Sequence, residues 1–276
     1  MRDAKKGPAP PLAPVYSAWF KEGSRELEAF RDAITDEGLR RVERREYVFT
    51  KAEVESAPLL HLTINRAPLL GGGVEDGTQF DLLTGCPHCG TGSVQSSPLF
   101  VPKSAVRQTS GLRQTVFGDT VASARIADAL IAEGVQGIRL GEVLSARTGE
   151  PLALRQLFTT EELPPWSART TGGEVGDKRC RVCKRDGHFD SMKDPLLVAY
   201  ERSEVNPEAL PDLVRTWEYF DYSWASEERL REVGYPPAKA LPMRLAKPML
   251  ICKQALRAVL GHYRVPGLRF EPVTLV

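Results

Sequence analysis

The chain has 276 residues, with 37 Lys and Arg against 36 Asp and Glu, so its formal net charge at pH 7 is +1. This balance disfavours a dedicated nucleic-acid-binding protein, which usually carries a clear basic excess. Hydrophobic residues make up 42% of the chain and charged residues 26%, as in ordinary globular proteins, and no apolar run is long enough to predict a membrane span.

The first 75 residues divide into a tail and a segment that mixes helix and strand. Residues 1–14 are rich in proline and alanine, and they predict a disordered tail because such a stretch cannot bury a core. Residues 15–75 form the N-terminal α/β segment. Its expected elements, in chain order, are a helix from Ser24 to about Arg41, a strand at 42–49, a short helix opened by the capping box Thr50–Glu53, a strand at 60–64 and a flexible glycine loop at 71–73.

Four of the five cysteines occur in two CxxC pairs. A CxxC loop directs two sulfur atoms at one point, and two such loops brought together form the four-thiolate cage that a structural Zn²⁺ prefers. The sequence therefore predicts a zinc ion held by Cys86, Cys89, Cys180 and Cys183. A closed site of this kind leaves no coordination position for a substrate. A disulfide, a redox-active CxxC and plain reduced thiols are the alternatives.

The surroundings of the cysteines favour the metal. The start of the chain, from Met1 to Lys6, does not resemble a secretory signal, so we expect a cytoplasmic protein in which disulfides are rare. The fifth cysteine, Cys252, lies among apolar residues on an expected helix and is expected in the core. Cationic residues surround the second pair and would lower the thiolate pKa values and offset the charge of the zinc centre: Lys178, Arg179, Arg181, Lys184 and Arg185.

An internal repeat organises the rest of the chain. Residues 121–143 align without a gap to residues 251–273, and each copy reads as an amphipathic helix, a turn and a strand entered through glycine. Each copy follows one CxxC pair. The predicted fold is α+β, with two related helix–strand halves joined by a split four-cysteine zinc ribbon. The predicted boundaries are 76–150 for the first half, 151–175 for a linker and 176–276 for the second half, with helices at 124–133 and 253–262 and strands at 137–142 and 267–272.

One acidic, aromatic segment is a candidate partner surface. Residues 201–232 contain nine acidic and four basic residues, whereas 233–270 contain seven basic residues and no acidic ones. Aromatic rings interleaved with carboxylates have the composition of a protein–protein hot spot. The alternative is that the rings fill the core and that the two charge blocks face each other. The candidate partner-binding residues are Trp217, Glu218, Tyr219, Asp221, Tyr222 and Trp224.

Few residues suggest catalysis. The chain has four histidines and shows no Ser-His-Asp set, HExxH motif or phosphate-binding loop. His88, inside the first CxxC, is expected to point outward. His188 lies between Asp186 and Asp190 just after the second CxxC and could serve in acid–base chemistry, although a turn stabilised by aspartate is the favoured reading. We therefore do not expect an enzyme, and no catalytic residue is predicted.

The two CxxC motifs and the closing module Gly267-Leu268-Arg269-Phe270-Glu271-Pro272-Val273 resemble the double-CxxCG family of myxobacteria. The resemblance covers residues 80–143 and 176–273. This chain has Cys183-Lys184 where the family has Cys-Gly, and residues 1–75 have no counterpart there.

The resemblance implies an immunity protein that neutralises a cognate toxin. The sequence therefore predicts a zinc-stabilised cytoplasmic binding protein that occludes a toxin through its surface. The alternative is a zinc-ribbon protein that binds nucleic acid through its basic second CxxC and the acid-free stretch 233–270. No membrane partner is expected, and the oligomeric state is left open.

Overall fold

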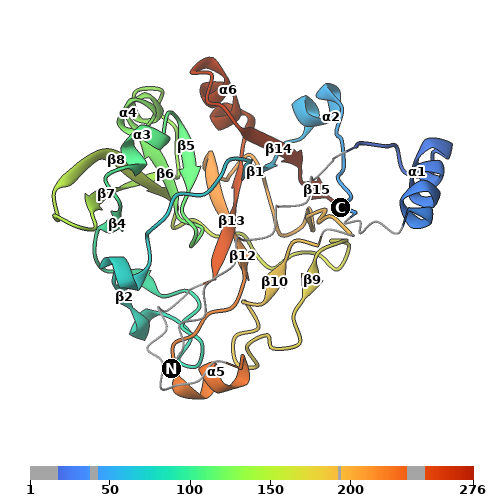
Figure 1. The fold of residues 1–276 in the computed structure, drawn as a ribbon. Coiled ribbons are helices and arrows are strands. Elements are labelled where there is room, and N and C mark those ends of the chain that lie inside the picture. The colour runs from blue at the N-terminus through green and yellow to red at the C-terminus, as the bar shows by residue number, and fades with distance from the viewer. Residues whose placement is uncertain (1–17, 38–42, 192–193, 235–245) are drawn as a thin grey trace, which may run out of the picture. The chain divides into compact units, whose positions relative to one another are not determined.

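The computed structural model describes residues 18–37, 43–191, 194–234 and 246–276 (Figure 1). The chain divides into two compact units, residues 1–44 and 45–276. The predicted tail at 1–14 lies outside the described residues. Within the described ranges, none of the helices combines the length and the apolar character that crossing a bilayer requires.

The first unit contains one described helix, α1 (Arg25–Asp36). The helix begins where the sequence predicts, because the Ser24 side chain accepts a hydrogen bond from the Leu27 amide. It ends at Asp36, whereas the prediction extended it to about Arg41. None of the α1 side chains is buried.

The strand predicted at 42–49 is not formed by its described residues, 43–49. Four consecutive charged residues, 43–46, interrupt the alternation of apolar and polar side chains that a half-buried strand needs. Two of these side chains make ion pairs, Glu43 with Arg31 and Glu46 with Arg269. The short helix that follows, α2 (Lys51–Ser56), has the predicted capping box between Thr50 and Glu53.

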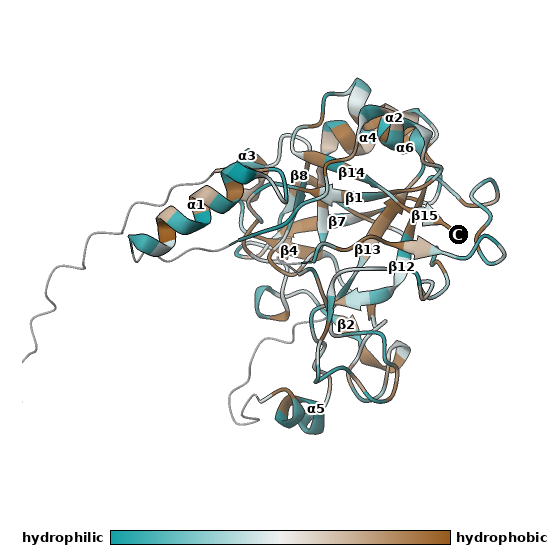
Figure 2. Ribbon diagram, turned by 90° about the vertical axis from the view of Figure 1, so that its right-hand side faces the viewer, coloured by the Kyte–Doolittle hydropathy of each residue, from teal (hydrophilic) through white to brown (hydrophobic). Residues whose placement is uncertain are grey.

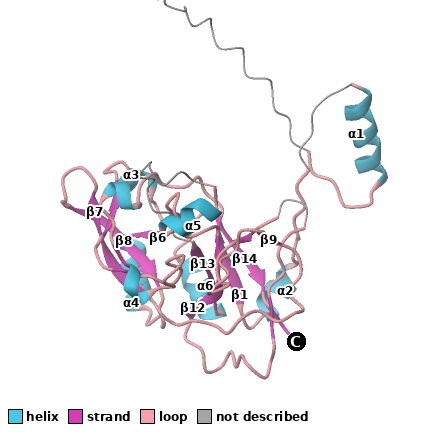
Figure 3. Cartoon of the chain, turned by 90° about the horizontal axis from the view of Figure 1, so that it is seen from below, coloured by secondary structure: helices cyan, strands magenta, loops and turns pink. Residues whose placement is uncertain are grey.

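Two sheets build the larger unit, which consists mainly of strands and loops with short helices (Figure 3). The six-stranded sheet has the order β14-β1-β13-β12-β10-β9. Its strands are β1 (Leu60–Ile64), β9 (Glu174–Val175), β10 (His188–Phe189), β12 (Leu213–Phe220), β13 (Lys247–Cys252) and β14 (Leu268–Pro272). The five-stranded sheet has the order β4-β7-β8-β6-β5. Its strands are β4 (Leu99–Val101), β5 (Leu112–Gln114), β6 (Thr120–Ser123), β7 (Arg139–Ser145) and β8 (Pro151–Phe158).

Smaller elements connect and flank the sheets. Two strand pairs lie outside them, β2 with β3 and β11 with β15. The elements are β2 (Phe80–Asp81), β3 (Val94–Gln95), β11 (Ala199–Tyr200), β15 (Thr274–Leu275), α3 (Ala105–Gln108), α4 (Ala124–Ala132), α5 (Glu227–Glu232), α6 (Gln254–His262) and the 3₁₀ turns η1 (Val74–Asp76) and η2 (Leu82–Thr84). The predicted glycine loop at 71–73 contains no helix or strand.

The two predicted helix–strand pairs are present in the structure. They are α4 with β7 and α6 with β14, and each begins within two residues of its prediction. In both cases the helix links two strands that are parallel to each other, because one strand lies between them and is antiparallel to both: β8 lies between β6 and β7, and β1 lies between β13 and β14. The flanking strands also correspond, since β5 pairs antiparallel with β6 and β12 pairs antiparallel with β13.

Aligned positions of residues 121–143 and 251–273 lie in one hydrophobic core. Ile126 and Leu130 of α4 pack in the same cluster as Leu256 and Leu260 of α6, and Cys252 joins them from β13 rather than from the helix expected there. Hydrophobic residues are concentrated on the strands inside this unit (Figure 2). Burying these side chains is the main stabilising contribution to such a core.

Two sequence-based boundaries differ from the structure. Residues 151–158, expected to open a linker, form β8, which lies in the middle of the five-stranded sheet and buries alternate side chains. Strand β1, assigned to the N-terminal segment, lies between β13 and β14 inside the six-stranded sheet. Prolines near 164 suggested a connector, but the alternation of Leu152 and Leu154 with charged or small residues is a strand pattern.

Candidate metal centre

The structure brings the four predicted cysteines together. The Sγ atoms of Cys86 and Cys180 are 3.9 Å apart, those of Cys89 and Cys183 are 3.5 Å apart, and all four lie within 4.8 Å of one another. A tetrahedral ion with metal–sulfur bonds of about 2.3 Å places its ligand sulfurs about 3.8 Å apart, whereas a disulfide requires about 2.05 Å. The four cysteines therefore lie close enough to bind a metal ion, and the two separations of 3.5 and 3.9 Å are near the value expected for four thiolates around one ion.

Both CxxC loops have the same backbone fold. In the first, the Gly90 amide donates to the Cys86 carbonyl at 2.7 Å, and in the second the Lys184 amide donates to the Cys180 carbonyl at 3.0 Å. Both residues have positive φ, +80° at Gly90 and +57° at Lys184. Lys184 thus takes the left-handed conformation that glycine adopts without steric cost.

Backbone amides and the neighbouring thiols set the ionisation of the sulfurs. The pKa of Cys183 is lowered to about 5, first because its sulfur accepts a hydrogen bond from the Cys89 thiol and also because the Arg185 amide points at it. The pKa of Cys89 is raised because it donates that bond and is buried, and burial raises the pKa of Cys180. The thiolate form is therefore favoured at Cys183, and because ligands bind a metal as thiolates, metal binding would release thiol protons.

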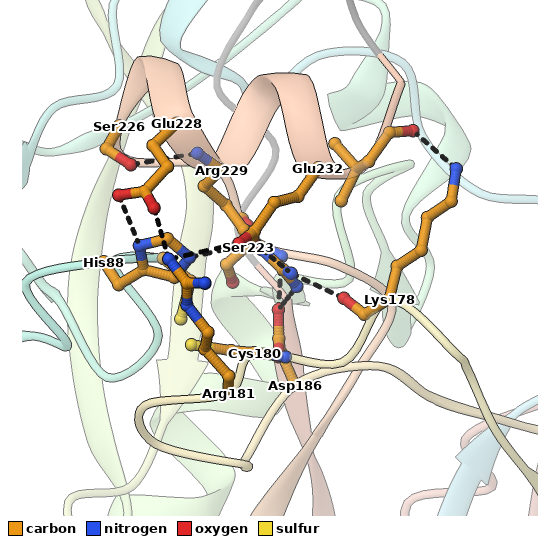
Figure 4. Close-up of polar contacts among 12 residues, drawn as sticks. His88, Lys178, Cys180, Arg181, Asp186, Ser223, Ser226, Glu228, Arg229 and Glu232 are labelled. Carbon is orange, nitrogen blue, oxygen red and sulfur yellow. Dashed lines mark hydrogen bonds and ion pairs between the residues drawn. The ribbon is translucent and has the colours of Figure 1, made fainter.

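A buried ion pair supports the second CxxC loop (Figure 4). The Asp186 carboxylate accepts hydrogen bonds from the Cys180 amide at 2.8 Å and from Arg229 Nη2 at 2.6 Å. Both side chains of the pair are fully buried. Arg229 also donates to the carbonyl of Lys178, two residues before the second CxxC, and to the carbonyl of Ser223, just before α5. The start of the second CxxC loop is thus tied to α5.

Helix α5 also contacts the first CxxC loop. His88 Nε2 lies 2.9 Å from a carboxylate oxygen of Glu232, and Arg181 pairs with Glu228 on the same helix. His88 is buried rather than pointing outward as predicted, because α5 covers it with these two carboxylates. The helix thus bridges the two loops that supply the cysteines.

The predicted partner-binding residues pack inside the protein instead of forming an exposed patch. Glu218, Tyr219 and Trp224 are buried, and Trp217, Asp221 and Tyr222 are partly buried. The Arg185 guanidinium lies 5.2 Å from the Trp217 ring centroid and 4.8 Å from that of Tyr219. These rings therefore hold a cation of the second CxxC loop, and the reading in which they fill the core describes this segment better than a hot spot.

A second polar cluster lies in the core beside β12. Glu218 accepts a hydrogen bond from the Trp166 amide at 2.8 Å, and Trp166 contacts the ring of His188. Burial raises the pKa of Glu218 to about 7 and lowers the pKa of His188 to about 4. His188 pairs with Phe220 as part of β10, not as the turn residue that was expected.

The arrangement around His188 does not form an acid–base pair with Asp186. Both Asp186 oxygens accept bonds from other groups, Oδ1 from the Cys180 amide and Oδ2 from Arg229 and the Ser223 amide. Among the described residues, His188 Nε2 has no hydrogen-bond partner. Asp186 and His188 therefore belong to two different buried clusters.

Sequence reasoning found the cysteines but missed the residues that support them. Arg229 lies 43 residues after Asp186, on a helix whose sequence, Glu-Glu-Arg-Leu-Arg-Glu, is typical of a solvated surface helix. Comparison of the chain with protein-family models finds no match, and comparison with curated proteins finds none either.

Proposed function

We propose that the four cysteines bind one Zn²⁺ and that the metal is structural. The observation that carries this proposal is the clustering of the four sulfurs within 4.8 Å of one another, with three of the cysteines buried. Four thiolates from two CxxC loops are a ligand set typical of structural zinc, and they leave no position for substrate or activated water. In this reading the metal joins two loops 94 residues apart in sequence, and the centre is a split zinc ribbon.

We also propose that the two strand–helix–strand units, β6-α4-β7 and β13-α6-β14, are copies of one ancestral unit. Their ungapped alignment and the antiparallel strand between each parallel pair support this. In each unit the middle strand comes from outside the aligned residues: it is β8 in the first unit and β1 in the second. The zinc ion would then join two related halves.

For the molecule as a whole we propose a cytoplasmic binding protein that neutralises a toxin protein by covering it. The resemblance to the double-CxxCG immunity family motivates this, and the closed metal centre supports a role without catalysis. Because the acidic, aromatic segment is packed against the second CxxC loop, the proposed contact surface does not include Trp217 and Tyr219.

One observation favours a protein partner over nucleic acid. Two of the five cations around the second CxxC loop are already in ion pairs: Arg181 pairs with Glu228 and Glu232, and Arg185 pairs with Glu162. Phosphate binding to Arg181 or Arg185 would have to compete with these carboxylates, so the two arginines are poorer phosphate ligands than the sequence suggests.

Co-expression with the toxin encoded by a neighbouring gene tests the proposal. The expected result is restored growth and a complex whose dissociation constant changes little between about 50 and 200 mM salt, whereas binding through several phosphates would weaken by orders of magnitude over that range. Growth arrest in the presence of the folded, zinc-loaded chain would contradict the immunity role. Tight, steeply salt-dependent binding to DNA or RNA would replace it with the nucleic-acid role.

A further inference from the structure

Three segments without a single acidic residue meet around β5. The Asn65 amide donates to the Gly267 carbonyl at 2.7 Å, and the Leu69 amide donates to the Gln114 carbonyl, also at 2.7 Å. The segments are residues 65–73, 103–118 and 261–268. They carry four arginines, which form the arginine patch: Arg66, Arg107, Arg113 and Arg264.

The arginine patch is not neutralised by the protein. None of its four side chains forms an ion pair with a carboxylate in the described part of the chain. The arginines beside the second CxxC differ in this respect, because Arg181 and Arg185 both pair with glutamates. Within the patch, Arg66 and Arg113 are partly buried, whereas the other two arginines are exposed.

Hydrogen bonds hold the two partly buried arginines side by side. Arg66 Nη1 donates to Ser110 Oγ at 3.2 Å. Arg113 Nε donates to the Gln108 carbonyl at 3.1 Å, and its Nη1 donates to the carbonyl of Ala67. Each guanidinium is therefore bound to the segment that carries the other one, and both are anchored before any ligand arrives.

The two charges are close enough to affect each other. The pKa of Arg113 is lowered by burial and, next, by the positive charge of Arg66. Gly267 packs directly against Arg66, because a Cβ atom at this glycine would lie only 2.4 Å from Arg66 Cγ. Arg66 is therefore held near a like charge, and an anion bound to both guanidiniums would relieve their repulsion.

Both guanidiniums keep hydrogen-bond donors for such an anion. A guanidinium has five N–H donors, and on partners within the described residues Arg66 uses one and Arg113 uses two. Planar arginine forks match the oxygens of phosphate and carboxylate groups. A phosphate monoester carries close to two negative charges at neutral pH and so balances both arginines, whereas a carboxylate balances one.

We propose that Arg66 and Arg113 together bind the phosphate group of a small phosphate monoester. The Ser110 hydroxyl, which accepts from Arg66, can donate its own proton to a phosphate oxygen, and Arg107 and Arg264 add positive charge around the site. The four cysteines take no part in this site, and its test needs no toxin. The proposal therefore stands or falls independently of the proposed function.

Three small anions test the proposal: methyl phosphate, dimethyl phosphate and acetate. Each is titrated at constant ionic strength into the full zinc-loaded chain, and backbone amide shifts are followed by NMR. At about pH 7.5 methyl phosphate is mostly a dianion, since its second pKa is about 6, whereas the other two are monoanions. We expect methyl phosphate to bind with a dissociation constant on the order of 1 mM and the monoanions about tenfold more weakly.

Matched variants locate the binding. Arg66→Gln and Arg113→Gln should each weaken methyl phosphate by about tenfold, because each removes one of the two charges with its hydrogen bonds. Arg202 is an exposed arginine after β11 without an ion pair among the described residues, so Arg202→Gln should leave the affinity unchanged. Thermal melting checks that each variant folds. If Arg113→Gln does not, Arg66→Gln decides the result, because it removes only the single bond to Ser110.

Four results would overturn the proposal. They are the absence of saturable binding of methyl phosphate, equal binding of acetate, parent-like affinity in Arg66→Gln, and an equal loss of affinity in Arg202→Gln. Equal binding of dimethyl phosphate would overturn it as well, and would point instead to the phosphodiester backbone of a nucleic acid.

Discussion

Single residues at the CxxC loops decide how tightly the backbone can wrap around the sulfurs. Gly90 and Lys184 occupy equivalent positions and both have positive φ, but only glycine takes that conformation without strain. The spacing of the cysteines was predictable from sequence. The strain at Lys184 was not, because a lysine after a CxxC does not by itself indicate a left-handed backbone.

Substitutions at these two positions should change the free energy of unfolding in opposite directions. Lys184→Gly should raise the free energy of unfolding by up to about 1 kcal/mol, since it relieves the left-handed lysine and removes only an exposed side chain. Gly90→Ala should lower it by about 1 kcal/mol. Urea denaturation of the zinc-loaded variants measures both. Equal losses in the two variants would show that the conformation at 184 is not strained.

Glu218 makes stability depend on pH. Burial raises its pKa from 4.5 to about 7, so its stabilising contribution is complete below about pH 4.5 and is lost as the pH rises through about 7. Glu218→Gln stays neutral throughout. We expect the unfolding free energy of the parent chain to fall relative to Glu218→Gln by roughly 2–3 kcal/mol between pH 5 and 8.

The control for this experiment is Glu142→Gln, which changes an exposed carboxylate. Its stability should run parallel to that of the parent chain over the same pH range. Because the cysteines are the same in all three proteins, the comparison removes the pH dependence of metal binding. Parallel curves for the parent and Glu218→Gln would mean that Glu218 is ionised in the folded protein over the whole range.

At the level of elements, local periodicity predicted more than long-range contacts did. The helices α4 and α6 and the strands after them follow from the spacing of residues such as Ile126, Leu130, Leu256 and Leu260. Strand β8 was taken for a linker because prolines follow it, although its alternation was visible. The aromatic segment was taken for a possible surface because carboxylates interleave with its rings, and the partners that bury it come from distant parts of the chain.

Helix α5 depends on one buried arginine. Arg229→Met should remove the partner of Asp186 and lower the unfolding free energy by about 3–5 kcal/mol, because an uncompensated buried carboxylate remains. Arg231→Met on the same helix breaks only an exposed pair with Glu227 and should change stability by less than about 1 kcal/mol.

Chemical denaturation in the presence of zinc measures both changes, and the double variant Asp186→Asn/Arg229→Met tests the coupling. The double variant should lose less unfolding free energy than the sum of the losses in Asp186→Asn and Arg229→Met measured separately, because neither partner is left charged alone. Additive losses would contradict a direct buried pair. Similar effects of Arg229→Met and Arg231→Met would show that α5 is attached by other contacts.

For the whole molecule, the four cysteines join parts of the chain that the sequence keeps apart. Cys86 and Cys89 precede the five-stranded sheet, and Cys180 and Cys183 lie close to β10 and β12 of the six-stranded sheet. Binding a metal between them closes a long loop, and its binding energy adds to the energy of folding. The ligand set could be predicted from spacing alone, whereas the bridge formed by α5 could not, because it depends on the tertiary fold.

Elemental analysis of the purified chain tests this account most directly. We predict one zinc per chain, loss of the metal together with a lower melting temperature in Cys183→Ser, and retention of the metal in Cys252→Ala, which changes the buried cysteine outside the cluster. A metal-free preparation with full stability, or a Cys183→Ser variant that keeps its zinc, would contradict the central claim that these four cysteines hold the molecule together through a metal ion.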